Sequence, residues 1–569
     1  MNLKTAAAAA SIVVMISGCG SRPTPARQTA SIARSRDSRQ DAEIFAYVAG
    51  ILNGLDQFDT AVAERDDMSK LNAAARRLIE SGVPPSLTSQ LNQWASSQPA
   101  VAGWRREPML VSLPDELRQL PQLKQLKTRK FSTEDGFSLR EAVWLRDISQ
   151  MAGGRTQDDV ELAAKLFDWV VRNIQLDADP STSDDGEAAS AALPTLPWQT
   201  LLLGHGMAID RAWLFTLLAR QQGMDVVILD RADLDRAEAP AGAPPLGLSA
   251  LLSNGELYLF DTALGLPIPG PGGKGVATLA QAVNDETVLR QLDLDSDQPY
   301  RLKDSDLAEV AALIEASPMY LCERMALVEQ QLSSEQKVVL SADASGVARR
   351  VSQCAHVATA RLWTLPLERA DAIRRGARKV TRRLVVELEP FAIPYFEASQ
   401  KRAGYTPALW RGRTLHLFGK CTGAESASRF YQIARPADAE FDRWMAGRFE
   451  EVEQLMQVNP DEHRRQKEAA ERFVECARIA KQDASYWLGL IAFQREDYPT
   501  AIDYLGKRTL EASPDGPWTS GAWYNLGRSY EALGQIDEAV GAYRQGESVQ
   551  RIGNLLRAKR LGQTAVSKE

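Results

Sequence analysis

The sequence predicts an α+β protein that is mainly helical, and three observations lead to this fold class. Apolar residues recur at every fourth position between Leu162 and Ile174, which is the spacing of an amphipathic helix. The short segment VVLSAD, residues 338–343, has the composition of a β-strand. A helical pattern that contains Leu488 occurs again 38 residues later, at Leu526. Helices are therefore expected to dominate, with a smaller contribution from strands.

Length and composition limit the class of protein. A chain of 569 residues is too long for one hydrophobic core and should divide into about three or four domains. The hydrophobic fraction of 44% and the charged fraction of 25% are those of a folded protein. A net charge of -7 and a pI near 5.5 argue against nucleic acid as a partner. The sequence contains no metal-ligand cluster and no nucleotide-binding loop, so neither a metal nor a cofactor is expected.

Composition and pattern divide the chain into six segments. They are a signal peptide (1–18), a disordered tether (19–40), an N-terminal helical segment (41–137), an α+β domain (138–275), a middle α+β region (276–455) and helical repeats (456–569).

The N-terminus predicts export. Lys4 is followed by an apolar run from Thr5 to Ile16, which is too short to cross a bilayer because a spanning helix needs roughly 20 residues. The sequence ISGC that ends at Cys19 resembles a bacterial lipobox. This resemblance implies that Cys19 carries acyl chains and anchors the protein to a membrane of the bacterial envelope, facing the periplasm or the exterior. A plain secretory signal is the alternative.

The residues after Cys19 favour a tether. Residues 20–40 contain five arginines, one aspartate and few apolar side chains, so they cannot bury a core. As a flexible coil they would reach on the order of 25 Å. Ile44, Phe45, Val48 and Ile51 then fall on one face of an expected helix.

The segment from about 138 to 269 resembles a transglutaminase-like domain. Its parts are an amphipathic helix (159–177), a glycine turn followed by a helix in GHGMAIDRAWLFTLLARQQGM (204–224), and NGELYLFDTALGLPI (254–268). In that family the turn has the pattern GxGxC, a histidine lies on the strand before the final hairpin, and an aspartate on that hairpin orients the histidine. The resemblance implies an α+β core and places the aspartate at Asp261.

Two of the three catalytic groups are absent from these positions. Two places after Gly206 the sequence has Ala208 where the family has its cysteine, and the expected strand 246–252 contains no histidine. His205 is the one histidine in this segment, and we interpret it as a solvated or capping residue. Asp261 could equally be a turn residue at the end of a strand. Gly206, Ala208, Trp213 and Asp261 could still line a binding pocket.

The mature chain has four other thiols, and none follows a glycine-rich turn at the start of a helix. Cys322, Cys354, Cys421 and Cys476 are therefore interpreted as small buried apolar residues. A rival hypothesis is an active cysteine-type acyl transferase or peptidase whose nucleophile has moved to one of these positions.

The middle region has one marked feature, a basic helix expected over 370–390. Arg374, Arg378 and Arg382 form one row along it, and Arg375, Lys379 and Arg383 form the next. The rows could contact an acidic partner or phosphate groups, but a solvated face paired with acidic neighbours is the favoured interpretation.

The C-terminal repeats resemble tetratricopeptide repeats. The residues at the matching positions are Leu488, Gly489, Ala501 and Leu505 in one unit, and Trp523, Leu526, Gly527, Tyr530, Ala539 and Tyr543 in the next. Small residues let the paired helices approach closely, and the helices before and after should complete the array. The resemblance implies docking of a protein or peptide partner, with packing against the chain itself as the alternative.

Together these features predict an envelope-anchored scaffold or binding lipoprotein. Its transglutaminase-like core would be non-catalytic, and its repeats would contact other proteins.

Overall fold

In a computed structural model of the protein, the described residues are 46–51, 75–76, 78, 85–154, 156–178, 195–232, 246–395, 406–446 and 463–566. The predicted signal peptide, the tether and Cys19 lie outside these residues. The described chain is an α+β structure in which helices predominate, as expected. No helix in these ranges is long and apolar enough to cross a membrane.

The N-terminal part is helical. Its elements are α4 (Pro85–Ser97), η2 (Pro108–Ser112), α5 (Asp115–Arg118), α6 (Pro121–Lys124) and α7 (Thr133–Gly153). Helix α7 begins with a capping box, in which Ser132 Oγ accepts from the Asp135 amide and Asp135 Oδ2 accepts from the Ser132 amide.

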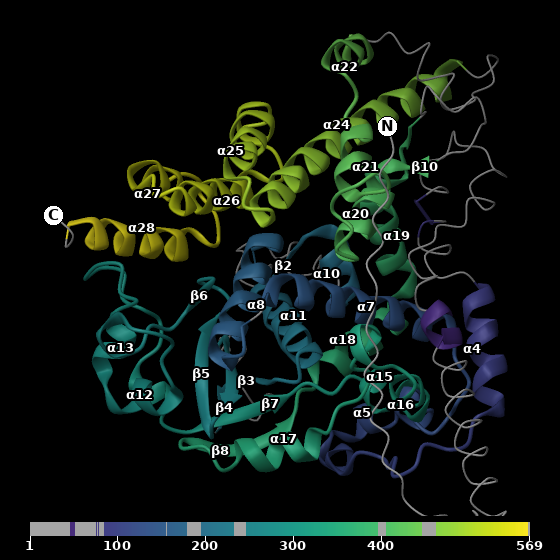
Figure 1. The fold of residues 1–569 in the computed structure, drawn as a ribbon, viewed down its shortest axis with the longest axis vertical. Helices are drawn as coiled ribbons and strands as arrows, with labels where there is room; N and C mark the ends of the chain where they lie inside the picture. Colours follow the sequence, from purple (N-terminus) through teal and green to yellow (C-terminus); the bar gives the residue numbers. More distant parts are fainter. Residues whose placement is uncertain are drawn as a thin grey trace, which may run out of the picture.

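The centre of the molecule is a six-stranded sheet of order β6-β5-β4-β3-β7-β8 (Figure 1). Its strands are β3 (Asp225–Arg231), β4 (Leu248–Ser253), β5 (Glu256–Asp261), β6 (Leu266–Pro267), β7 (Val310–Ile314) and β8 (Val357–Leu362). Neighbouring strands are antiparallel except β7 and β8, which are parallel. Asn254 and Gly255 both have positive φ, the backbone of a tight turn, and join β4 to β5 as a hairpin.

Helices pack on this sheet. They are α8 (Asp159–Asn173) and α11 (Ala208–Gln221), while α10 (Pro197–Leu203) packs against α7, α11 and α20 (Ala408–Leu417). The short parallel pair β1 (Gln175–Leu176) and β2 (His205–Gly206) joins the end of α8 to the turn before α11. Helix α11 lies against β3, α7 and α8 and is buried over most of its surface, which explains why its sequence is apolar on every side.

The segment that follows β6 extends the sheet. Its elements are η4 (Pro271–Gly273), α12 (Leu279–Asn284), α13 (Glu286–Arg290), α14 (Asp304–Leu307), α15 (Pro318–Leu321), α16 (Glu323–Gln330), η5 (Ser334–Gln336) and α17 (Ala344–Val351). The sequence analysis missed β7 and β8. Its predicted strand at 338–343 was wrong, because these residues form no strand and the chain turns there into α17.

The basic segment is two helices rather than one. Gly376 separates α18 (Leu365–Arg375) from α19 (Ala377–Leu388). The next elements are η6 (Pro390–Ala392), β9 (Pro394–Tyr395), β10 (Thr406–Pro407), α20 (Ala408–Leu417), α21 (Ala427–Ile433) and α22 (Asp438–Met445).

The C-terminal repeats form an array of antiparallel helices along one side of the sheet domain (Figure 1). They are α24 (His463–Gln494), α25 (Tyr498–Ile502), the π-helical segment η7 (Asp503–Glu511), α26 (Thr519–Ala532), α27 (Ile536–Tyr543) and α28 (Arg551–Val566). The helix predicted before the first repeat is continuous with that repeat's first helix in α24.

Candidate functional site

The start of helix α11 is where the resemblance places a nucleophile. The helix begins at Ala208, and Asp210 Oδ2 accepts from the Met207 amide at 2.8 Å, which fixes this first turn. Asp210 also forms an ion pair with Arg369 of α18. A helix N-terminus lowers the pKa of a thiol placed on it. Ala208 provides only a methyl group at this position.

Arg211 joins this first turn to the end of β5. Its guanidinium donates to the Ile174 carbonyl at 2.6 and 2.9 Å and to the Thr262 carbonyl at 3.5 Å. Because Thr262 follows Asp261, the first turn of α11 and the predicted aspartate belong to one neighbourhood. Burial lowers the pKa of Arg211 to about 10, which still leaves it charged at neutral pH. Arg211 was not predicted from the sequence; the available signal was an arginine in the first turn of a largely apolar helix.

Asp261 is fully buried and already has four hydrogen-bond donors. Oδ1 accepts from the amides of Ala263 and Leu264, both at 2.9 Å. Oδ2 accepts from Tyr300 Oη at 2.7 Å and from Arg301 Nη2 at 3.0 Å. A carboxylate offers about four lone-pair positions, so this one has no capacity for an imidazole. Burial and the Asp261 charge raise the pKa of the Tyr300 hydroxyl well above its ordinary value, which keeps it a donor.

The strand beside Asp261 also lacks a base. In the β4–β5 ladder, Leu248 is the partner of Asp261, and its side chain is completely buried. Arg301 fills the space next to Gly247, where an added Cβ would lie 2.9 Å from Nη2. The position that the family gives to histidine is therefore apolar and closed.

His205 has an acidic partner of its own. Its Nδ1 lies 2.7 Å from Asp177 Oδ2, and its side chain is 33% exposed. Burial alone would lower the pKa of His205, but the hydrogen bond and charge of Asp177 outweigh burial and raise it. The ring packs edge-on against Trp518 of the repeats, with 6.3 Å between centroids. His205 thus lies where the sheet domain meets the C-terminal helices.

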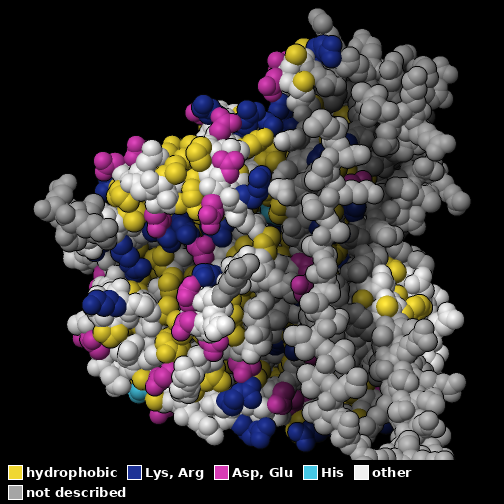
Figure 2. Space-filling view, in the orientation of Figure 1, with side chains coloured by type: hydrophobic (Ala, Val, Ile, Leu, Met, Phe, Trp, Pro, Cys, Tyr) yellow, Lys and Arg dark blue, Asp and Glu magenta, His cyan; other side chains and the backbone are white. Residues whose placement is uncertain are grey.

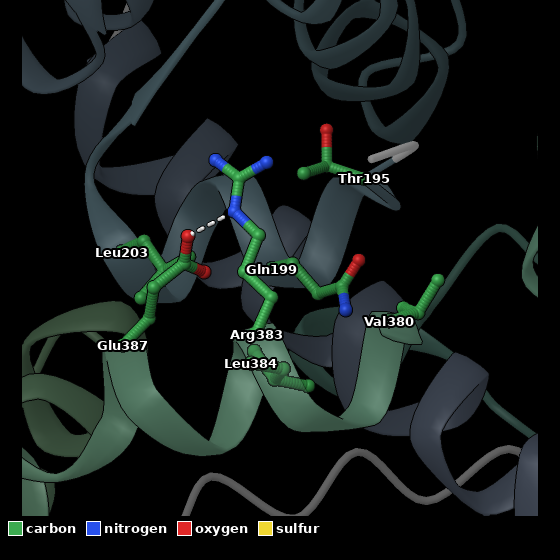
Figure 3. A pocket seen from close by; sticks show the side chains of 7 residues that line it. All are labelled: Thr195, Gln199, Leu203, Val380, Arg383, Leu384 and Glu387. Carbon is green, nitrogen blue, oxygen red and sulfur yellow. Dashed lines mark hydrogen bonds and ion pairs between the residues drawn. The ribbon is translucent and has the colours of Figure 1, made fainter. Parts of the chain in front are cut away.

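The other predicted pocket residues, Trp213 and Gly206, are buried against different neighbours. Trp213 is buried on α11 and packs edge-on against Trp363 at 5.6 Å, and it also lies beneath Arg369. Gly206 is buried in β2, where an added Cβ would lie about 3.0 Å from Thr200. A small pocket lies elsewhere, between α10 and α19 (Figure 3). Its lining includes none of Gly206, Ala208, Trp213 or Asp261.

The four described thiols were the candidates for a relocated nucleophile. Burial raises the pKa of Cys322 and Cys421 to about 11, that of Cys476 to about 12, and that of Cys354 above its ordinary value. The Cys322 thiol donates to the Met319 carbonyl. Among the described residues, no thiol has a hydrogen bond to a histidine. A nucleophilic thiol requires a lowered pKa, whereas the surroundings of all four thiols raise it.

The inner face of the repeats is bound to the sheet domain. The Tyr486 hydroxyl and Asn525 Nδ2 both donate to the Arg172 carbonyl at the end of α8, at 3.4 and 3.0 Å. Asp168, one turn earlier, forms ion pairs with Arg172 and with Arg528 of α26.

A second set of contacts extends this interface. Gln175 of β1 donates to the Pro517 carbonyl and accepts from the Gly521 amide. Gly553 of α28 lies against the backbone of Leu264, just after Asp261.

Asp483 and Trp518 are buried where the repeats approach His205. Trp518 Nε1 donates to Asp483 Oδ1 at 2.6 Å. Burial raises the pKa of Asp483 to about 7, although the Trp518 bond and the charges of His205 and Arg413 oppose the shift. The Arg413 guanidinium donates to the carbonyls of Leu201 and Leu202 before the glycine turn. An added Cβ at Gly204 would lie 3.2 Å from both Trp518 and Arg413, so the repeats and α20 together cover the turn that precedes α11.

Small residues lie between the paired helices of each repeat. An added Cβ at Gly527 would lie 2.6 Å from the ring of Tyr543, and one at Gly489 would lie 2.8 Å from Leu505. The remaining predicted packing residues are largely buried, except that Tyr530 is partly exposed: Leu488, Ala501, Leu526, Tyr530 and Ala539.

Comparison with known proteins identifies one repeat unit. The tetratricopeptide repeat family matches residues 522–545, which span most of α26 and all of α27. No curated protein and no solved structure matches the chain. The described residues contain no group of three or more histidine, cysteine, aspartate or glutamate side chains that could hold a metal ion.

Proposed function

We propose that this chain is a non-catalytic scaffold or binding lipoprotein of the bacterial envelope. Its transglutaminase-like core would have no catalytic activity, and its tetratricopeptide repeats would contact a protein partner. The observation that carries the proposal is that both carboxylate oxygens of Asp261 already accept hydrogen bonds. Its four donors occupy the carboxylate that would orient a catalytic imidazole, while Ala208 stands at the nucleophile position.

The surroundings of the thiols support the non-catalytic part. A cysteine enzyme needs a thiolate and a base within hydrogen-bond reach. The described thiols have raised pKa values and no histidine partner, so they favour a scaffold over a relocated acyl transferase.

The packing of the repeats indicates which surface a partner would use. Gly521, Asn525 and Arg528 of α26 contact α8 and β1, so this face is occupied by the chain itself. The outer helix α27 exposes Asp537, Glu538 and other residues to solvent. Figure 2 shows acidic, basic and apolar side chains interspersed over the outer surface of the repeats, a mixture suited to a polar protein interface. We therefore propose α25, η7 and α27 as the partner surface.

Two measurements test the proposal. The first is exposure of the wild-type chain to an activated acyl probe, followed by mass spectrometry of its peptides. We expect no stoichiometric adduct; an adduct on Cys322, Cys354, Cys421 or Cys476 that unfolding abolishes would establish the relocated enzyme instead.

The second measurement is the intact mass of protein purified from the envelope. Mature protein should begin at an acylated Cys19, and Cys19→Ser should be released from the membrane fraction. An unmodified N-terminus elsewhere would remove the anchor from the proposal.

A further inference from the structure

The helices α18 and α19 carry a local concentration of positive charge in an acidic protein. The ten residues from 374 to 383 contain six basic side chains and no acidic one, in a chain whose net charge is -7. The six are Arg374, Arg375, Arg378, Lys379, Arg382 and Arg383.

Half of these cations are paired within the two helices. Arg374 and Arg375 both form ion pairs with Asp371, one turn before them. Arg383 pairs with Glu387 at 2.7 Å and lines the pocket beside Gln199 of α10 (Figure 3). These three side chains fit the solvated, paired face that the sequence analysis favoured.

The other three cations have a different setting. Arg378, Lys379 and Arg382 are exposed, and none forms an ion pair with a described residue. Lys379, Arg382 and Val386 follow one another at helical spacing, and Val386 is 46% exposed. The exposed side of α19 therefore presents three cations that have no ion-pair partner in the described part of the chain, next to one apolar side chain.

The opposite side of α19 holds the helix in place. Val380, Leu384, Val385 and Leu388 are buried against the rest of the protein. Because this apolar face is already packed against the protein, it is not available for insertion into a bilayer, unlike the apolar face of a free amphipathic helix. Any contact made by its exposed side is electrostatic and superficial.

We propose that this exposed side of α19, formed by Arg378, Lys379, Arg382 and Val386, docks on a membrane surface rich in anionic lipid headgroups. Basic clusters bind such surfaces because the negative surface potential attracts each cation. A membrane is favoured over an acidic protein because the proposed anchor at Cys19 would keep the chain within tether reach of one, and the inference rests on the proposed function in that respect. The exposed Val386 fits the boundary between headgroups and acyl chains.

Vesicle flotation tests the proposal without the lipid anchor. The protein is the mature chain, residues 19–569 with Cys19→Ser, which contains every described residue. Vesicles of phosphatidylcholine with phosphatidylglycerol are compared with vesicles of phosphatidylcholine alone. The triple variant R378Q/K379Q/R382Q is compared with the control R105Q/R106Q/R349Q, which removes three exposed charges elsewhere.

Wild type should float with the anionic vesicles and not with the neutral ones, and added salt should weaken the binding. The triple variant should bind on the order of 100-fold more weakly, while the control keeps most of the affinity. All substitutions are at exposed positions, so thermal unfolding should be unchanged. Equal binding by the triple variant and wild type would overturn the proposal. Absence of wild-type binding to anionic vesicles would do the same and would leave an acidic protein as the remaining class of partner. The intact mass at Cys19 is measured separately, so failure of the anchor and failure of this surface are distinguishable.

Discussion

The Asp261 neighbourhood and the interface between α8 and α26 are both buried and polar, but their polar groups connect different parts of the chain. Around Asp261 the donors come from within 40 residues: Ala263, Leu264, Tyr300 and Arg301. At the interface, Arg172 and Asp168 of α8 bind Asn525 and Arg528, more than 300 residues away. The first network fixes the loop after β5, at the position that the transglutaminase-like resemblance assigns to the catalytic aspartate. The second fixes the whole C-terminal array on the sheet domain.

The difference shows what the inner face of the repeats does in this chain. Polar side chains on that face form hydrogen bonds with buried polar groups of α8. Without these side chains, the groups would be shielded from water and would have no hydrogen-bond partner. The repeats are therefore part of the fold as well as a proposed partner surface. Four predictions test this comparison, in order of decreasing effect.

The largest effect is expected from changes inside the second repeat. Ala539→Arg would place an unpaired charge at a completely buried position, and Gly527→Leu would force a side chain into the ring of Tyr543. Each should destabilise the array by several kcal/mol, on the order of the cost of overpacking or of a buried unpaired charge. Limited proteolysis after Ser485 and thermal unfolding would measure this loss of stability.

Gly541→Ala is the matched control, because an added Cβ there meets nothing within 4 Å, and it should leave stability equal or slightly higher. Wild-type resistance of Ala539→Arg to protease would contradict the repeat packing.

A smaller effect is expected from Asp168→Ala, which removes the carboxylate shared by Arg172 and Arg528. Burial alone would raise the pKa of Asp168, but the charges of Arg528 and Arg172 outweigh burial and lower it, so the carboxylate is ionised at neutral pH. Its loss leaves Arg528 largely buried without its main partner and should weaken docking by roughly 2–3 kcal/mol.

Hydrogen exchange should show the Asp168→Ala effect in α8 and α26, while β3 and β4 keep their protection. Asp503→Ala removes an exposed pair with Arg508 and serves as the control, with an expected change of about 0–1 kcal/mol. Uniform loss of protection across the sheet would show that the interface and the core unfold as one unit.

A third prediction concerns pH. The pKa of Asp483 is about 7 in the folded protein and near its ordinary 3.8 when unfolded. Between these values the folded state holds a proton that the unfolded state has released, so the free energy of unfolding should fall as pH rises from about 4 to 7. Asp483→Asn keeps an acceptor for Trp518 and cannot ionise, so its stability should fall less over this range.

Urea unfolding of wild type and Asp483→Asn at pH 5 and pH 8 measures the difference. Glu141, whose pKa burial raises to about 8, contributes the same slope in both proteins and cancels in the comparison. Parallel curves for the two proteins would mean that Asp483 titrates normally at the interface.

The smallest effect is expected at the start of α11, where the transglutaminase-like resemblance places a nucleophile. Ala208→Cys places a thiol at the start of α11, but Asp261 remains bound by Tyr300 and Arg301, and Leu248 still occupies the place beside it. We expect alkylation of the new thiol without acyl transfer, because a nucleophile without its base gives little of the catalytic effect. Turnover by Ala208→Cys would show that another group, with His205 the nearest candidate, can act as base.

Local patterns explain what could be predicted. The apolar spacing of α8 and the small residues of the repeats each act within a few positions of the chain. The strands β7 and β8 were missed because distant contacts form them: β7 pairs with β3 and is buried, while β8 pairs with β7 at the edge of the sheet and is mostly exposed or half-buried. The pattern around Gly376 predicted one continuous helix. In the structure Gly376 separates two helices, α18 and α19.

By itself the sequence determined the helical character, the repeat pattern and the absence of a cysteine and a histidine at the family's positions, because each of these depends on residue identity and local spacing. Only the tertiary structure decided that Asp261 is taken by Tyr300 and Arg301, that the thiols have raised pKa values, and that the inner face of the repeats is bound to α8. Those facts depend on which distant residues meet in space. Burial then sets their energies, because a polar group without water must find its partner within the fold.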